Sequence, residues 1–362
     1  MESIFVSPGK YFQGPGILSK IGILCNNLGN KCILLGDKTV LDIISGTVKN
    51  SLEKVQIEST IEEFNGECTK KEIYNLSEIA KKSSANFIIA AGGGKSLDTG
   101  KAIASQLNID CVIVPTIAAT DAPTSSVAVL YNEKHVYDGV MKFNRNPSIV
   151  IVDSEIISKA PSRYLVSGMG DALATKFEAN ACFLSGAKNC HGYNSTVAGL
   201  KLANLCFETI LENGVMAKIS NEKGIVTTYL EKVIEANILL SGLGWENCGE
   251  ALAHAFDGAI TNISKTKSKF HGERVAVGLL IQLIIEDMKL SEILNIVNFY
   301  KKVNLPITLE DLGVNINSKS EIEVFIKNLF REGSYIYNMP FNITKNDIIN
   351  AIKFLDVLKN IN

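Results

Sequence analysis

The sequence predicts an α/β domain with a parallel sheet over residues 1–160, followed by an all-α domain over residues 161–362. Up to about residue 160, short apolar runs rich in β-branched residues alternate with segments of helical periodicity. These apolar runs contain almost no alternating polar residues, which is typical of strands that are buried on both faces of a helix-covered parallel sheet. After Pro161 the apolar spacing becomes helical almost throughout.

The elements of the first part follow in a regular order. We predict strands at residues 31–35, 55–64, 86–91, 111–114 and 148–152, and a hairpin at residues 126–131 and 135–143. Helices are expected at residues 40–52, 70–83 and 96–107. Strands that alternate with helices predict a parallel, doubly wound sheet.

The second part is expected to be helical. The predicted helices are residues 165–184, 195–211, 226–243, 246–260, 273–288, 290–303, 321–330 and 345–357. No low-complexity linker separates the two parts, so we expect the two domains to pack directly against each other.

Composition excludes several classes of protein. With 46% hydrophobic and 20% charged residues the chain can build a large core, which excludes a disordered or fibrous protein. A net charge of −2 provides no basic field for nucleic acid or for a membrane surface. The N-terminus does not resemble a signal peptide, and no apolar stretch is long enough to span a bilayer. The eight cysteines show no C-x-x-C spacing, so we expect reduced thiols in a cytoplasmic protein, with neither disulfides nor a zinc–thiolate site.

A glycine turn follows the strand predicted at residues 86–91. Gly92, Gly93 and Gly94 allow close backbone approach to a ligand, and Ser96 is expected to cap the next helix, whose N-terminus favours phosphate. The turn matches neither a Walker A loop nor G-x-G-x-x-G, because residue 89 is Ile and residue 97 is Leu. It indicates a pyrophosphate site, with a tight strand–helix connection as the alternative.

Two acidic residues follow predicted strands. Asp37 comes directly after the first strand, where dinucleotide-binding sheets place an acid on the adenosine ribose, and a carboxylate there would favour NAD over NADP. Asp121 lies in a hydroxyl-rich loop at residues 115–126 and could orient a hydroxylated ligand. A helix cap and a solvated loop are the respective alternatives.

A candidate metal site combines two of the four histidines with one acid. His254 is predicted to lie in the middle of a helix, His271 at the start of the next one, and Asp171 in a glycine-rich stretch. Two imidazoles and one carboxylate leave open positions on a divalent ion, as a catalytic metal requires. The alternative is that each histidine is an ordinary hydrogen-bonded residue, which is our expectation for His135 and His191.

Several motifs in one order resemble the iron-containing alcohol dehydrogenase superfamily, and within it the glycerol-oxidising branch. They are SPGKYFQG (7–14), FNGECT (64–69), GGGKSLDTGKA (92–102), PTIAATDAPTSS (115–126), GDALATKFEA (170–179), LSGLGWENCG (240–249), HAFDG (254–258), HGERVAVG (271–278) and YNMPFNIT (337–344). The resemblance covers nearly the whole chain. It implies a dinucleotide-binding domain followed by a helical metal domain, and an NAD-dependent oxidation of glycerol or a similar vicinal diol.

The resemblance also implies roles for individual residues. The metal, Zn²⁺ or alternatively Fe²⁺, would be held by Asp171, His254 and His271, and the catalytic residues would be Asp121 and His254. Cofactor contacts are implied for Asp37, Gly93, Gly94, Lys95, Asp98, Thr116, Ala119, Ser125, Val127 and Tyr131. The expected partner is a small polyol, with no nucleic acid and no membrane, and the implied assembly is a homo-oligomer, often an octamer.

The chain departs from the family pattern in the candidate metal region. Where glycerol-oxidising members commonly have HAIHNG, this chain has HAFDG, with Asp257 after His254, and Trp245 replaces the usual Phe. The preferred substrate therefore stays open between glycerol and another small diol, an amino alcohol or a 2-hydroxycarboxylate. Two other classes also stay open: a lyase similar to dehydroquinate synthase, and a catalytically inactive dinucleotide-binding module.

Overall fold

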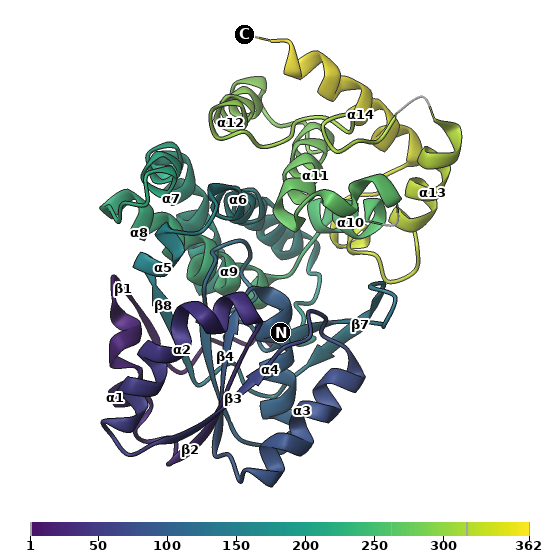
Figure 1. The fold of residues 1–362 in the computed structure, drawn as a ribbon. Helices are drawn as coiled ribbons and strands as arrows, with labels where there is room; N and C mark the ends of the chain where they lie inside the picture. Colours follow the sequence, from purple (N-terminus) through teal and green to yellow (C-terminus); the bar gives the residue numbers. More distant parts are fainter. Residues whose placement is uncertain (1, 262, 316–317, 362) are drawn as a thin grey trace. The chain divides into compact units, whose positions relative to one another are not determined.

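The structure is a computed structural model that describes residues 2–261, 263–315 and 318–361 (Figure 1). Packing divides the chain into two compact units. The sheet unit comprises Val6–Pro161 and Ser220–Gly242, and the helical unit comprises the described residues of Met1–Phe5, Ser162–Ile219 and Leu243–Asn362. A single domain boundary between residues 160 and 161 stays a prediction. The chain changes unit after Pro161 and again on either side of the segment 220–242.

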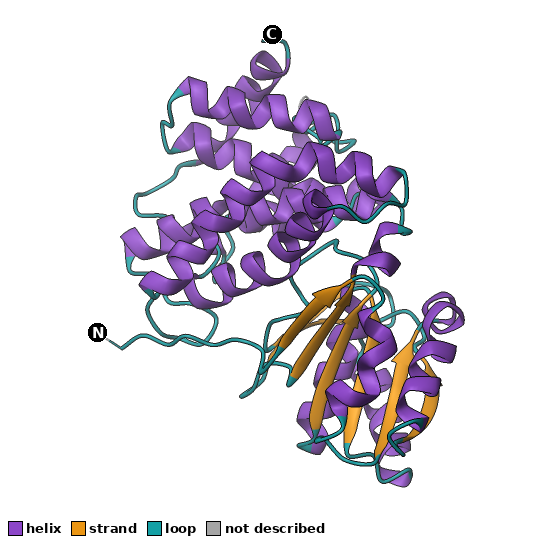
Figure 2. Ribbon diagram, turned by 90° about the vertical axis from the view of Figure 1, so that its left-hand side faces the viewer, coloured by secondary structure: helices purple, strands orange, loops and turns teal. Residues whose placement is uncertain are grey.

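The sheet unit is built on a six-stranded sheet with the order β1-β8-β5-β4-β2-β3. Its strands are among the orange arrows of Figure 2. Every pairing between these strands is parallel. The strands are β1 (Tyr11–Gly14), β2 (Lys31–Gly36), β3 (Glu58–Glu63), β4 (Phe87–Gly92), β5 (Asp110–Pro115) and β8 (Ile149–Asp153). A separate antiparallel hairpin consists of β6 (Val127–Tyr131) and β7 (Tyr137–Lys142).

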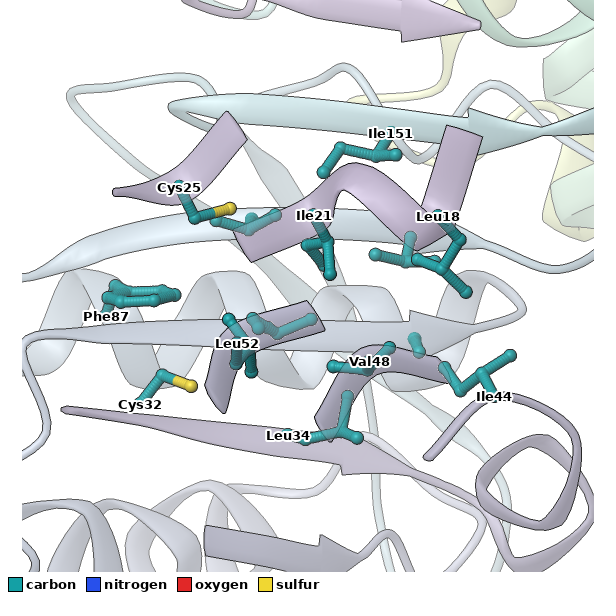
Figure 3. Packing of buried hydrophobic residues seen from close by; sticks show 14 of the residues in the cluster. Leu18, Ile21, Cys25, Cys32, Leu34, Ile44, Val48, Leu52, Phe87 and Ile151 are labelled. Atoms are coloured by element: carbon teal, nitrogen blue, oxygen red, sulfur yellow. The ribbon is translucent and has the colours of Figure 1, made fainter. Parts of the chain in front are cut away.

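Burial of both faces of the sheet explains why its inner strands β4, β5 and β8 are apolar runs. All six residues of β4 are buried. Phe87 on β4 joins a hydrophobic cluster with residues of α1 (Ile21–Cys25) and α2 (Lys38–Glu53), and Figure 3 shows it beside Leu52. The next residue, Ile88, faces the opposite side, where α4 (Gly94–Leu107) covers the sheet and α3 (Lys70–Lys82) packs against α4.

Several short elements of the sheet unit were not predicted from the sequence. They are β1, the 3₁₀ turn Ile17–Lys20, α1 and α5 (Ser154–Ser158). Each has at most five residues, which is too short to establish a periodicity. The predicted cap of α4 is wrong: the helix begins at Gly94 with Gly93 as its N-cap, and the Ser96 hydroxyl donates to the carbonyl of Ala91 at 2.7 Å.

The remaining elements are helical. They are α6 (Ser162–Ser185), α7 (Val197–Glu222), α8 (Thr228–Glu235), a π-helical turn (Ala236–Leu240), α9 (Ser241–Cys248), α10 (Leu252–Ile260), α11 (His271–Ile285), α12 (Leu290–Val303), α13 (Lys319–Leu329) and α14 (Lys345–Lys359), with 3₁₀ turns at Ser264–Ser268 and Tyr335–Asn338. The predicted fold class, a parallel α/β part followed by an all-α part, is confirmed. None of the helices in the described residues is long and apolar enough to traverse a lipid bilayer.

The predicted single helix at residues 246–260 is wrong. Helix α9 ends at Cys248 because Gly249 adopts φ of +116°, a conformation that strongly favours glycine. The N–H of Gly249 closes the helix on the carbonyl of Trp245 at 2.6 Å. Helix α10 then starts at Leu252, so His254 lies in its first turn and not in mid-helix.

The segment 220–242 is fixed to the sheet unit by side chains that reach backbone carbonyls. Asn221 donates to Ser158 at 2.9 Å, and Asn237 on the π-helical turn donates to Ala118 at 2.9 Å. In a third contact, the Gln13 amide donates to the carbonyl of Glu231 at 2.8 Å. The helical segment 220–242 therefore packs with the sheet. Through Asn237 it also holds the loop that follows β5.

Candidate functional site

The candidate metal residues are carried by three helices that pack with their backbones unusually close together. A Cβ atom built on Gly272 of α11 would lie 1.8 Å from the carbonyl oxygen of Ser167 on α6. One built on Gly278 of α11 would lie 2.6 Å from the carbonyl oxygen of Ala253 on α10. Only glycine permits these approaches, which bring the neighbours of Gly272 and Ala253 in the sequence to one place.

Asp171, His254 and His271 converge there as predicted. The Nε2 atoms of His254 and His271 lie 3.2 and 3.3 Å from Oδ1 of Asp171. The centroids of the two imidazole rings are 5.3 Å apart, and the donor atoms of all three residues lie within 4.8 Å of one another. Both carboxylate oxygens of Asp171 are buried without a hydrogen bond of normal geometry, an arrangement that is costly unless a cation lies close by.

A buried carboxylate orients His254. Glu178 on α6 accepts from Nδ1 of His254 at 2.5 Å, and it also accepts the backbone N–H groups of Ala251 and His254 at 2.8 and 2.9 Å. The Glu178 side chain therefore caps the N-terminus of α10, a task that the N-cap residue Ala251 cannot perform. Because a carboxylate only accepts hydrogen bonds, Glu178 keeps a proton on Nδ1, and Nε2, which faces Asp171, is the nitrogen that would coordinate a metal.

A second carboxylate orients His271 in the same way. Asp257 on α10 accepts from Nδ1 of His271 at 2.9 Å, and its other oxygen accepts from Nε of Arg274 at 2.5 Å. Asp257, with Gly258, is one of the two residues at which the sequence analysis found a departure from the HAIHNG pattern. In this chain it forms a carboxylate–imidazole pair, held in place by a guanidinium group.

The electrostatics of the metal-free residues favour positive charge. Burial is the largest influence on His271 and lowers its pKa, but Asp171 and Asp257 outweigh burial and raise the pKa to about 10. Burial also lowers the pKa of His254, which Glu178 and Glu250 nevertheless raise well above its ordinary value. For Glu250, whose Oε1 lies 3.6 Å from Nε2 of His254, burial raises the pKa of the carboxyl group. The surrounding carboxylates therefore stabilise a cation at this position.

These residues fit a divalent metal ion. One carboxylate oxygen and two imidazole Nε2 atoms form a three-ligand set with open coordination positions, and each imidazole donates its other ring N–H to a carboxylate. That second set of hydrogen bonds distinguishes the arrangement from an incidental cluster of polar side chains.

The predicted cofactor residues of the sheet unit gather at one edge of the sheet. Asp37 follows β2, Gly93 follows β4 and Thr116 follows β5, so that all three lie at the carboxyl ends of neighbouring parallel strands. Asp37 caps α2 by accepting from the N–H of Val40 at 3.0 Å. Gly93 and Gly94 form the start of α4, whose first N–H groups are available to an anion.

Asp98, Ser125 and Val127, which were also predicted to contact the cofactor, surround the buried ammonium group of Lys101. No role for Lys101 was predicted from the sequence. Lys101 on α4 donates to the carbonyl of Ala122 at 2.9 Å, to Ser125 Oγ at 3.4 Å, and to the carbonyl of Val127. Its Nζ also lies 2.8 Å from Asp98, whose other oxygen accepts the N–H of Val129 at 2.8 Å. Lys101 thereby connects α4 to the loop after β5, and its position one turn after Asp98 was the available cue.

The other predicted residues of the sheet unit, Lys95, Tyr131, Asp121 and Ala119, do not contact Lys101 in the interactions described above. The Lys95 ammonium pairs with Glu67 and lies 4.9 Å from the centroid of the Tyr131 ring. Asp121 accepts from the hydroxyl of Ser241 at 2.7 Å, and Ala119 is half-buried in the same loop. Glu67 and Ser241 were missed by sequence reasoning because each lies far along the chain from its partner.

The chain is similar to known proteins over nearly its whole length. Residues 8–154 match the family model described as iron-containing alcohol dehydrogenase. The chain is 40% identical to a glycerol dehydrogenase of Citrobacter freundii, over 99% of this chain and 98% of that protein. It is 38% identical to a glycolaldehyde reductase of Halobacterium salinarum, over 98% of each. The crystal structure of glycerol dehydrogenase from Schizosaccharomyces pombe is similar with a TM-score of 0.94 and 34% identity, covering 99% of this chain and 91% of that one.

The raised histidine pKa values predict how the stability of the metal-free protein changes with pH. His271 ordinarily titrates near 6.5 and has a folded pKa of about 10, so its contribution to stability is complete below pH 6.5 and is lost as the pH rises towards 10. We expect the melting temperature of chelator-treated protein to fall over this range. A His254→Ala/His271→Ala variant should show a shallower fall. A wild-type melting temperature that stays constant or rises over this pH range would contradict the raised pKa of His271.

The hydrogen bond from His271 to Asp257 predicts an effect on metal affinity. Asp257→Asn should weaken zinc or cobalt binding about 10–100-fold, as is typical when the carboxylate partner of a ligating histidine is lost. Equilibrium competition with a chelator measures the affinity without recourse to activity. Glu321→Gln, which removes a carboxylate paired with Lys265 elsewhere in the helical unit, is the matched control. Equal affinities in Asp257→Asn and the wild type would show that Asp257 does not support the metal site.

Proposed function

Since the chain belongs to the iron-containing alcohol dehydrogenase family, we propose that it oxidises glycerol or a similar vicinal diol with NAD⁺. A hydride passes from the carbinol carbon to C4 of the nicotinamide and the hydroxyl proton is released, so glycerol gives dihydroxyacetone and NADH. The observation that carries this proposal is the three-ligand set of Asp171, His254 and His271 with a carboxylate behind each imidazole.

The chain's own residues prepare that set for a divalent metal, which when bound acts as a Lewis acid and makes a substrate hydroxyl more acidic. Glu178 and Asp257 keep the Nδ1 protons in place, so that each Nε2 is the nitrogen that would coordinate the metal after release of its own proton. Asp171 supplies one negative charge from a buried position and leaves a bound dication with net positive charge. These residues would therefore hold a divalent metal, whose charge would favour the deprotonated form of the alcohol.

For the sheet unit we propose that NAD⁺ binds at the carboxyl edge of the sheet. The N-terminus of α4 at Gly93 and Gly94 would face the pyrophosphate, and Asp37 the adenosine ribose. Contacts with the rest of the cofactor are proposed for Lys95, Asp98, Thr116, Ala119, Ser125, Val127 and Tyr131. The fold itself already engages Asp98 with Lys101 and Val129, so its contribution is to fix the binding loop.

Asp121 is proposed to bind the hydroxyl next to the one that is oxidised. The hydrogen bond from Ser241 to its Oδ2 fixes the carboxylate, which is then a preformed acceptor for a substrate O–H group. Such a residue favours a diol over a simple alcohol because it recognises the second hydroxyl.

A second candidate is the reduction of a small hydroxyaldehyde with NADH. It is favoured by the 38% identity to a protein named glycolaldehyde reductase, over 98% of each chain. The same metal and cofactor residues serve both directions of the reaction. Rates with glycerol, dihydroxyacetone and glycolaldehyde at one cofactor concentration decide between the two.

We also propose zinc as the metal and a cytoplasmic homo-oligomer as the working form. An Asp/His/His ligand set suits zinc. The large apolar side chains Val197, Leu205, Met216 and Ile219 on α7 are exposed, which favours contact with another copy. Metal analysis and light scattering of the purified protein test these points.

The metal site predicts the outcome of removing either histidine. In His254→Ala and His271→Ala, the rate of NADH formation from glycerol should fall about a thousandfold or more, because several kcal/mol of transition-state stabilisation is lost. NADH binding, followed by fluorescence, should be nearly unchanged. Steady NADH formation by the wild type also separates this enzyme from a lyase that regenerates its cofactor. Wild-type rates in either variant after chelation would refute the assignment.

The proposed role of Asp121 predicts a selective loss of activity. Asp121→Asn should lower kcat/KM for glycerol about 10–100-fold, the effect of losing one hydrogen bond to a charged group. The value for propan-2-ol, which lacks a second hydroxyl, should change much less. An equal decrease for both alcohols would assign Asp121 a role other than recognition of the neighbouring hydroxyl.

A further inference from the structure

A second cluster of metal-binding side chains lies in the helical unit, formed by Cys190, His191 and Glu246. Their potential ligand atoms lie within 4.8 Å of one another, and none of them belongs to the site of Asp171. Nε2 of His191 is 3.3 Å from Oε1 of Glu246, and Sγ of Cys190 is 3.7 Å from the Glu246 carbonyl oxygen. This cluster was not predicted, because Glu246 is distant in the chain and the cysteines lack C-x-x-C spacing.

A rigid loop presents two of these residues. Asn189, in the connection between α6 and α7, is buried, and its Oδ1 accepts the N–H groups of His191 and Tyr193 at 3.1 and 3.2 Å. Its Nδ2 donates to the carbonyl of Asn247 on α9 at 3.4 Å. The loop is therefore fixed to the helix that carries Glu246, so that the three ligand atoms are already assembled.

The three side chains of the cluster differ in their exposure to solvent. The Glu246 side chain has no exposed surface, whereas that of His191 is 15% exposed and Cys190 is half-buried. A nearby cation stabilises a carboxylate that is buried to this extent. The partly exposed side of the cluster gives an ion and a water molecule access to the ligand atoms.

We propose that Cys190 Sγ, His191 Nε2 and a carboxylate oxygen of Glu246 bind a second divalent metal ion, of the class of Zn²⁺ or Co²⁺. Sulfur, imidazole nitrogen and carboxylate oxygen are the three ligand types of protein zinc, and a water molecule completes four-coordination. Binding converts the thiol to a thiolate, which replaces its hydrogen bond to the Glu246 carbonyl, and the thiol proton is released to solvent. The ion links the loop to α9 and has a structural role.

Sulfur makes this site distinguishable from the first one. The Asp171 site contains no thiolate, so a thiolate-to-cobalt charge-transfer absorption reports on the Cys190 site alone. Burial raises the pKa of Cys25, Cys32, Cys68, Cys111 and Cys248 to about 12, so these thiols keep their protons. Cys190 is the half-buried exception among the eight cysteines, all of which lie in described residues.

The test is a titration of the metal-free full-length protein with Co²⁺. We expect two classes of bound cobalt, one of which develops the charge-transfer band. Cys190→Ser should abolish the band and one bound equivalent, and should leave the rate of NADH formation from glycerol unchanged. His191→Asn, a change in a half-buried loop residue, should also weaken the band. Cys25→Ala, which removes a thiol from the sheet unit, should keep both the band and the stoichiometry.

The outcomes separate this proposal from the proposed function. A single bound equivalent in the wild type without a charge-transfer band overturns the second site, whatever the activity. A band that persists in both Cys190→Ser and His191→Asn overturns it as well. Loss of glycerol oxidation in His254→Ala with the band intact supports two independent sites.

Discussion

Close contact between glycines of α11 and the backbones of α6 and α10 is the constraint on which the candidate metal site depends. Gly272 places α11 against α6, and Gly278 places it against α10, closer than any other residue type permits. Asp171, His254 and His271 lie within one residue of these contacts or of their partners in α6 and α10. The geometry of the ligands is therefore determined by main-chain packing, which is far more rigid than the side chains themselves.

Much of the fold could be predicted because its long elements carry strong periodicity. The central strands β2, β4 and β5 are continuous apolar runs, and the amphipathic helices α3, α12 and α14 have clear spacing. Short elements such as β1 and α5 lack enough residues for a pattern. The break between α9 and α10 was missed because it depends on one glycine with positive φ, inside a stretch whose composition is helical on both sides.

The site residues divide in the same way. Asp171, His254 and His271 could be proposed from ligand type and from the family resemblance, and they do converge. Their carboxylate partners could not, although Glu178 lies about two helical turns after Asp171, on the same face of α6. Lys101 is a comparable case, because an ammonium group in a glycine-rich motif suggests a ligand contact, whereas here its hydrogen bonds are made within the protein. Hydrogen-bond partners that are distant in sequence become visible only in three dimensions.

The discontinuous course of the chain has a consequence for how this protein can be divided. Residues 220–242 pack with the sheet unit, yet they stand between two stretches of the helical unit. A gene fragment that stops after Pro161 would encode a sheet without the side chains of Asn221, Asn237 and Ser241, which hold its connecting segments. Neither unit is one continuous stretch of the chain, so a single cut in the gene would leave both units incomplete.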